Sequence, residues 1–258
     1  MTFTARSGIP PTHSSPPPLA RRAIPQPEIA ASDPAHISAV ETAPSPVSPP
    51  VRRWSGSAWL LLRRDAGASL APGGALGGSQ AGGRFLYRLN DSADRALALS
   101  GRIYAPLRRP AGAEAAIGLD WQPIANVPVR LLIERRQGLG SEGRSAFAVA
   151  AYGGDSVALG RGWRLDGYAQ AGVVGARSRD AFIDGAVRIV RAAGPLEFGG
   201  AAWGAAQPGG ARFDAGPQIA LPFRAGDASL RLSGEYRFRI AGGVRPASGP
   251  TLTLGVDF

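Results

Sequence analysis

The sequence predicts an all-β protein, and three observations lead to that fold class. Apolar and polar residues alternate in a succession of short segments over most of the 258 residues, which is the period of a strand with two unlike faces. Turn residues separate the segments, and the chain holds 36 Gly and 23 Pro. About twelve such segments occur, and an even number of strands of roughly ten residues is typical of a transmembrane antiparallel up-and-down β-barrel.

Each expected strand is an alternating stretch that ends at a turn signal. In one of them Phe85 and Tyr87 lie on one side of the two-residue period and Arg84 and Arg88 on the other, until "NDSAD" interrupts it. The expected strands are, in order, "SAWLLLRRD" (57–65), "SQAGGRFLYRLN" (79–90), "ALALSGRIYAPL" (96–107), "AEAAIGLDWQP" (113–123), "VPVRLLIERRQ" (127–137), "RSAFAVAAYG" (144–153), "GWRLDGYAQAGVVG" (162–175), "DAFIDGAVRIVR" (180–191), "PLEFGGAAWGA" (195–205), "ARFDAGPQIALPF" (211–223), "ASLRLSGEYRFRI" (228–240) and "SGPTLTLGVDF" (248–258).

The chain divides near residue 56. Residues 1–56 hold 12 of the 23 Pro and show no sustained period, so we expect a disordered Pro-rich tail or linker there. Residues 57–258 are expected to form the barrel. The basic, apolar and small-residue blocks of a secretory signal do not occur at the start, so we expect a misassigned start or a fragment.

The character of the two faces favours a barrel in lipid over the alternative, a soluble β-sandwich with a binding or structural role. The chain is 44% hydrophobic but has no run of about 18 apolar residues, so any membrane span must be made of strands. The lipid-facing side is expected to include Leu97, Leu99, Ile117, Leu119, Leu252 and Leu254. Interfacial aromatic girdles are expected from Trp121, Trp163, Trp203, Tyr87, Tyr104 and Tyr236.

The polar face carries Arg together with Asp and Glu, which suits a closed lumen where opposite charges on neighbouring strands pair. Because Arg outnumbers the carboxylates, we expect an Arg-lined, anion-selective constriction, or else a sealed interior and a membrane anchor. The connections are short, and "APGGALGGSQAGG" is interpreted as a flexible loop, so no folded loop is expected to narrow the bore. The expected lumen-lining residues are Arg84, Arg88, Arg102, Arg130, Glu134, Arg136, Arg164, Asp166, Arg188, Arg212, Asp214, Arg231, Glu235, Arg237 and Arg239.

The chain ends on an aromatic residue behind a strict alternation. This pattern, carried by Leu252, Leu254, Val256 and Phe258, resembles the C-terminal signal that the barrel-assembly machinery of Gram-negative bacteria recognises. We expect Phe258 at the periplasmic rim with its ring toward lipid. The last strand should pair with residues 57–65, which removes both sheet edges.

The residue inventory argues against catalysis and nucleic-acid binding. The chain has 0 Cys and 2 His, His13 and His36, both in the expected tail. A Ser-His-Asp site, a Cys nucleophile and a His-ligated metal are therefore excluded from the barrel, and we expect no catalytic, cofactor-binding or metal site. The formal charge of +10 comes from Arg spread over the strands rather than clustered on one face, unlike a nucleic-acid binder.

The segment "GAEAAIGLDWQPIANVPVRLLIERR" resembles part of the C-terminal domain of the bacteriophage N4 adsorption protein A family, in which a strand ends in an aromatic-X-Pro turn and the next runs into a Glu-Arg pair. "LRLSGEYRFRI" is similar to the penultimate strand of that domain, and the resemblance covers residues 79–258. It implies an outer-membrane barrel associated with surface polysaccharide export and phage attachment, with outer-membrane lipid and an anionic polysaccharide or export partners as ligands. The matching residues are Gly118, Trp121, Pro123, Leu131, Glu134 and Arg135.

Overall fold

The structure is a computed structural model that describes residues 52–258 except 64–69, 72–75, 77, 93–94 and 108–111. Most of the expected tail therefore lies outside the described residues. The first strand begins at Trp54, so the last residues that the pattern assigned to the tail, 54–56, belong to that strand. The described part of the chain contains no helix with the length and apolar character that a membrane span requires.

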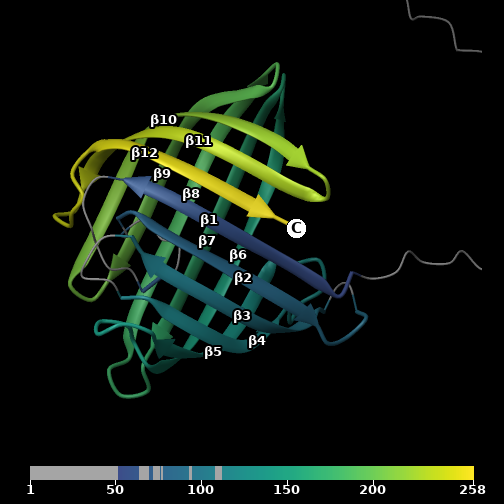
Figure 1. The fold of residues 1–258 in the computed structure, drawn as a ribbon. Coiled ribbons are helices and arrows are strands. Elements are labelled where there is room, and N and C mark those ends of the chain that lie inside the picture. The colour runs from purple at the N-terminus through teal and green to yellow at the C-terminus, as the bar shows by residue number, and fades with distance from the viewer. Residues whose placement is uncertain (1–51, 64–69, 72–75, 77, 93–94, 108–111) are drawn as a thin grey trace, which may run out of the picture. The chain divides into compact units, whose positions relative to one another are not determined.

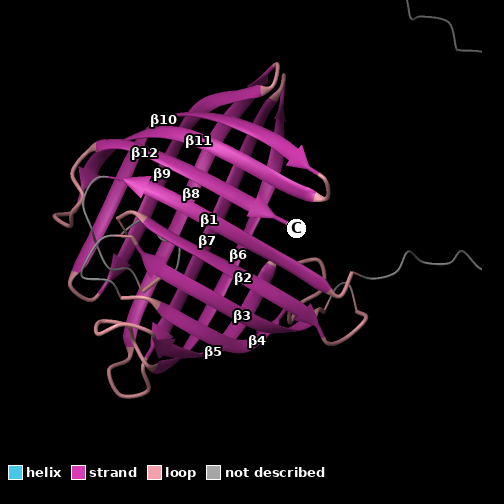
Figure 2. Ribbon diagram, in the orientation of Figure 1, coloured by secondary structure: helices cyan, strands magenta, loops and turns pink. Residues whose placement is uncertain are grey.

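The described residues form one closed antiparallel barrel in which each strand pairs with its neighbours in sequence (Figures 1 and 2). This confirms the predicted fold class. The sandwich alternative is wrong, because a sandwich needs two separate sheets with edges. The strands are β1 (Trp54–Arg63), β2 (Gln80–Arg88), β3 (Leu97–Pro106), β4 (Glu114–Trp121), β5 (Val129–Gly138), β6 (Ala146–Gly160), β7 (Trp163–Val174), β8 (Asp180–Ala193), β9 (Leu196–Gln207), β10 (Gly210–Ala225), β11 (Ala228–Ala241) and β12 (Gly249–Asp257).

The last strand closes the ring on the first. Leu60 of β1 stands opposite Leu254 of β12, and in Figure 1 the purple β1 lies between the yellow β12 and β2. Because the number of strands is even, β1 begins and β12 ends at the same rim of the barrel. We call this rim the terminal rim and the opposite one the far rim.

The strands are not of equal length. β1–β5 and β12 have 8 to 10 residues, as expected, but β6–β11 have 12 to 16, so a uniform length of roughly ten is wrong for half of them. The pairing of β5 with β6 ends at Val129 opposite Gly153, and beyond this point β6 pairs with β7 alone. One side of the barrel, β6–β11, therefore rises higher at the terminal rim, and Figure 1 shows the hairpin ends of β6 and β8 extending past the end of β12.

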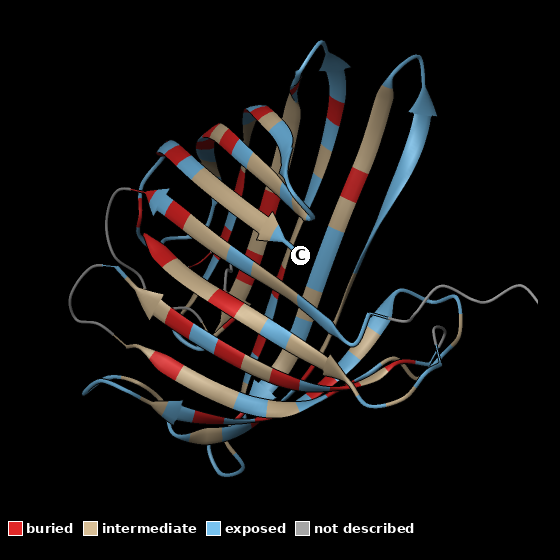
Figure 3. Ribbon diagram, turned by 45° about the vertical axis from the view of Figure 1, so that its right-hand side comes forward, coloured by how far each residue is buried: buried red, intermediate tan, exposed pale blue. Residues whose placement is uncertain are grey.

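The outer face of the barrel is almost entirely apolar. Every strand alternates, and the outward residues are exposed while many inward ones are buried (Figure 3). Ile103 and Ile117 are each 60% exposed and Ile133 is 57% exposed. A water-soluble monomer rarely exposes so much continuous apolar surface, so the outer face is suited to contact with lipid.

Two of the expected girdle residues lie inside the barrel instead. Trp203 is 6% exposed and Tyr104 is 5% exposed, so their assignment to an outer girdle is wrong. The reason is their position in the alternation, since Tyr104 follows the inward Arg102 by two residues and Trp203 shares the inward side with Ala205. The other four, Tyr87, Trp121, Trp163 and Tyr236, stand at outward positions.

Candidate functional site: the barrel lumen

The residues that the sequence assigned to the lumen all occupy the inward positions of their strands. They differ in burial, however. Eight are buried, namely Arg102, Glu134, Arg136, Asp166, Arg212, Asp214, Glu235 and Arg237. Seven are half-buried, namely Arg84, Arg88, Arg130, Arg164, Arg188, Arg231 and Arg239.

A buried ion triad fills the lumen near the far rim between β1 and β10. Arg63 donates a hydrogen bond from Nη2 to Oδ2 of Asp214 at 3.1 Å, and Arg212 donates from Nε to the same oxygen at 2.6 Å. The three side chains are 0 to 1% exposed. Charges so far from water are stable only when they are paired, so Asp214 is required to hold both arginines inside the barrel.

A second buried network lies across the lumen on β3, β4 and β5. Glu134 accepts hydrogen bonds from Nη2 of Arg102 at 2.8 Å and from Nε of Arg136 at 2.7 Å. Arg136 also lies 3.9 Å from a carboxylate oxygen of Glu114. Both sides of the far half of the lumen are thus occupied by paired charges.

Part of the connection between β1 and β2 lies inside the barrel. Leu76 is 2% exposed and packs with Trp203 and Ala205, and Ala71, also 2% exposed, packs with Phe182 and Val174. The expectation that no loop occupies the bore is therefore wrong. The stretch is rich in Gly and Ala and has no period of its own, so no local pattern marks it as an inward segment.

The same connection is tied to the lumen wall by hydrogen bonds of its backbone. Gln207 accepts a hydrogen bond from the N–H of Leu70 at 2.7 Å through Oε1, and Arg136 donates from Nη1 to the carbonyl oxygen of Leu70 at 2.9 Å. Apolar packing and polar anchoring therefore act together to hold the described residues Leu70, Ala71 and Leu76 inside the barrel.

The half of the lumen toward the terminal rim contains open space. One cavity of about 900 Å³ is lined mainly by β6–β11 and includes Arg164, Arg188 and Arg231. A second, of about 780 Å³, reaches the terminal rim at Gln122 and Asp257. The described residues therefore place buried ion pairs and Leu76 toward the far rim and two cavities toward the terminal rim.

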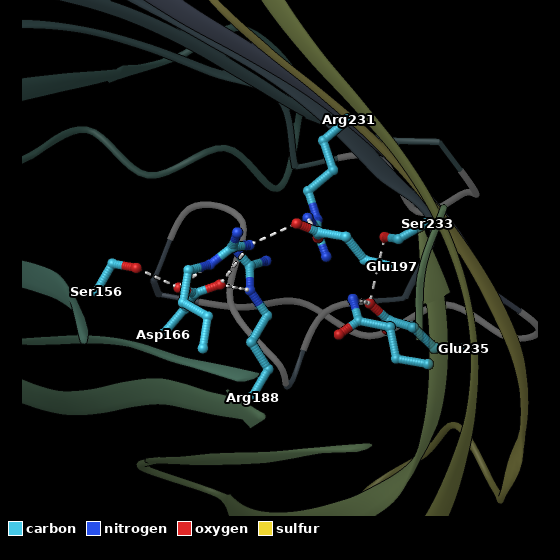
Figure 4. Close-up of polar contacts among 9 residues, drawn as sticks. Ser156, Asp166, Arg188, Glu197, Arg231, Ser233 and Glu235 are labelled. Carbon is cyan, nitrogen blue, oxygen red and sulfur yellow. Dashed lines mark hydrogen bonds and ion pairs between the residues drawn. The ribbon is translucent and has the colours of Figure 1, made fainter. Parts of the chain in front are cut away.

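The first cavity is bordered by a network of alternating charges (Figure 4). Asp166 accepts hydrogen bonds from Ser156 at 2.6 Å, from Arg164 at 2.7 Å and from Arg188 at 2.8 Å. Glu197 pairs with Arg164 at 2.8 Å and with Arg231. The guanidinium groups are partly exposed to the cavity, but each already has a carboxylate partner.

The second cavity is lined by Arg84, whose guanidinium contacts an aromatic ring instead of a carboxylate. The Cζ atom of Arg84 lies 4.9 Å from the ring centroid of Tyr152, a cation–π contact. Tyr152 and Arg130 both donate hydrogen bonds to Asp120. Among the inward arginines in the described part of the chain, Arg84, Arg88, Arg224 and Arg239 have no carboxylate within ion-pair distance.

Sequence reasoning left several charged residues out of the lumen-lining set. The signal that could have found them is parity, because each lies an odd number of residues from an exposed apolar residue on the same strand, namely Leu62, Ile117, Leu119 or Phe198. The omitted charged residues reduce the excess of positive charge inside the barrel. They are Arg63, Glu114, Asp120 and Glu197, all buried.

The described residues hold no cluster of His, Cys, Asp and Glu that could bind a metal ion. His13 and His36 lie outside the described residues. The four residues of the expected assembly signal, Leu252, Leu254, Val256 and Phe258, lie on the outer face of the strand that closes the barrel and at its end.

Comparison with known proteins gives similarity in fold alone. No family model and no curated protein matches the chain, so the resemblance to the phage N4 adsorption protein A family stays a prediction. An outer membrane channel from Pseudomonas putida F1 is 10% identical, with a TM-score of 0.45 over 81% of this chain and 96% of that one. The NanC porin is 8% identical, with a TM-score of 0.40 over 79% of this chain and 98% of that one.

Proposed function

We propose that this chain is a non-enzymatic barrel of the outer membrane of a Gram-negative bacterium and serves there as a membrane anchor with a closed lumen. The observation that carries the proposal is the continuous apolar outer face of a barrel with no free sheet edge. Strands can cross a bilayer only when every backbone group is paired within a closed ring, and such barrels have an apolar band that faces the lipid.

The connections support an orientation with both ends of the barrel in the periplasm. At the terminal rim, β6–β7, β8–β9 and β10–β11 are joined by tight turns that contain Gly162, Gly194 and Gly226, each with a positive φ. At the far rim the β1–β2 connection spans residues 64–79. Short periplasmic turns and longer outer loops are typical of bacterial barrels.

The contents of the lumen favour the anchor over an open pore. The triad around Asp214, the network around Glu134 and the inward-lying Leu76 together fill the far half. Ions or solutes that entered from the terminal rim would reach the two cavities and then meet these buried ion pairs and Leu76. Opening the lumen would separate several buried ion pairs, which is costly.

A narrow anion-selective pore is the second candidate, and the two cavities favour it. Arg84 has no carboxylate partner among the described residues, and the side chains of Arg164 and Arg188 are 40% and 36% exposed. A route to the far rim would need the β1–β2 connection to move. Polysaccharide export and phage adsorption are supported by the family resemblance alone, and they would make an anionic polysaccharide the ligand of these arginines.

Membrane insertion is tested with the full chain refolded in a nonionic detergent. We expect a folded band that changes its electrophoretic mobility on heating, and loss of the protein from solution when detergent is removed. A protein that stays monodisperse without detergent and migrates identically before and after heating would refute the membrane barrel.

The anchor and the pore are separated by recordings in planar lipid bilayers. The anchor predicts no conductance by the refolded barrel. Small anion-selective steps would favour the pore instead. A large non-selective conductance or a preference for cations would contradict both, because neither is compatible with an Arg-rich, filled interior.

A further inference from the structure

Charged residues are almost absent from the outer face of the described strands. The exceptions are Arg135 on β5, Asp155 on β6 and Arg191 on β8. Asp155 lies beyond the last pair between β5 and β6, and Arg191 lies at the terminal end of β8. Arg135 is the exception near the far rim, and its cross-strand neighbours Ile117 and Phe147 are apolar.

The register fixes the height of Arg135 in the barrel wall. On one side it pairs with Ile117 of β4, and on the other side it pairs with Phe147 of β6. Phe147 is at the far end of its strand, where its carbonyl oxygen accepts a hydrogen bond from Gly175 in the next connection. Arg135 therefore lies at the edge of the apolar face, where a lipid-facing cation is tolerated, whereas the same charge at the bilayer midplane is costly.

The guanidinium of Arg135 is held in place without an anionic partner. Its Cζ atom lies 5.1 Å from the ring centroid of Phe147, a cation–π contact that orients the planar group. No carboxylate among the described residues lies within ion-pair distance of it, although Arg136, the next residue, has two such partners. The guanidinium of Arg135 is exposed, is oriented by the ring of Phe147 and has no carboxylate partner among the described residues, so it can bind an anion from outside the protein.

The polar character of this position extends to the rim along β5. Gln137, which is two residues further on the same face, donates hydrogen bonds from Nε2 to Oγ of Ser145 at 3.0 Å and to the carbonyl oxygen of Gly138 at 3.3 Å. Arg135, Gln137 and Ser145 are thus polar side chains near the far rim of an otherwise apolar outer face. They face the lipid and not the lumen, so the ligand that reaches Arg135 is a lipid headgroup.

We infer that Arg135 binds the phosphate of an anionic lipid headgroup in the leaflet at the far rim. The fork of a guanidinium matches two phosphate oxygens in a bidentate arrangement, and Phe147 keeps that fork at the height of the headgroups. The inference rests on the proposed function, because it requires the barrel to lie in a membrane. It is separate from any role of the lumen.

The test measures lipid binding to the full chain refolded in dodecyl maltoside. The probes are dioctanoyl phosphatidic acid, dioctanoyl phosphatidylcholine and inorganic phosphate, and the readout is the shift in the midpoint of thermal unfolding at increasing probe concentration. We expect Arg135→Gln to weaken the binding of phosphatidic acid about tenfold. Arg135→Lys keeps the charge but not the fork. Its affinity for phosphatidic acid should lie between those of the unmodified chain and Arg135→Gln. Arg191→Gln, which removes another outward Arg, is the matched control and should bind like the unmodified chain.

Each outcome decides the inference. Equal binding of phosphatidic acid by the unmodified chain and Arg135→Gln would overturn it, as would an equal response to phosphatidylcholine. An equal response to inorganic phosphate would show a site for free anions and not for a lipid. Heat-modifiable mobility is measured on the same samples, so a protein that is not a membrane barrel is recognised independently of lipid binding.

Discussion

Gly56 and Phe258 exchange both of their backbone hydrogen bonds: the N–H of Gly56 donates to the carbonyl oxygen of Phe258 at 2.8 Å, and the N–H of Phe258 donates to that of Gly56 at 3.0 Å. The ring of Phe258 also packs edge-on against Phe85, with 5.6 Å between the ring centroids. The last residue of the chain is therefore part of the seam between β1 and β12, and this placement leads to the first two predictions.

The seam predicts a sharp boundary for truncation from the N-terminus. Removal of residues 1–51 should leave the heat-modifiable band intact, because the strand begins at Trp54. Removal of residues 1–56 should lower the yield of folded protein, because it deletes the partner of Phe258 and the pairing of Trp54 with Tyr87. Both truncated chains are refolded in detergent beside the full chain. Equal folding of the two would contradict a stabilising role for the seam.

Phe258→Ala should lower the amount of barrel in the outer membrane of cells more than it lowers refolding in detergent. Assembly in cells depends on the proposed terminal signal, whereas refolding loses only the contact with Phe85. Phe258→Tyr keeps an aromatic ring and serves as the control. The measurement compares heat-modifiable protein in membrane fractions with that in refolding mixtures. An unchanged amount of Phe258→Ala barrel in the membrane fraction would show that Phe258 is not part of an assembly signal.

Asp214→Asn should destabilise the barrel by about 3–5 kcal/mol, because it leaves Arg63 and Arg212 buried without their carboxylate. Asp227→Asn removes a carboxylate from an exposed pair in which Arg52 and Asp227 are 66% and 82% exposed. This control should cost less than about 1 kcal/mol. Urea unfolding in detergent measures both, and a similar effect of the two substitutions would show that the triad is not a structural element.

Leu76→Asp should open the far half of the lumen. An ionised side chain cannot remain against Trp203 and Ala205 without a large desolvation cost, so the connection should leave the barrel. We expect conductance steps in planar bilayers for this variant and fewer or none for Leu89→Asp, whose leucine is 46% exposed near the terminal rim. If the Leu76→Asp variant folds but shows no conductance, the ion pairs alone close the lumen.

The residue pattern along the chain predicts the fold class, the order of the strands and the strand face that carries the charged residues. A period of two residues is a local property, so the alternation of Phe85 and Tyr87 with Arg84 and Arg88 is visible without any distant contact. The same rule would have placed Trp203 and Tyr104 inside. An aromatic residue type alone does not place a side chain in an outer girdle, because the strand period decides which face it occupies.

The tertiary structure decided which charges meet and what fills the bore. Arg63 and Asp214 are 151 residues apart, and they meet only because closure of the ring leaves just β12 and β11 between β1 and β10. Leu76 lies inside because Trp203 and Ala205 leave apolar space at its height. Such contacts depend on closure and on the stagger of the strands, and no pattern along the chain records either of them.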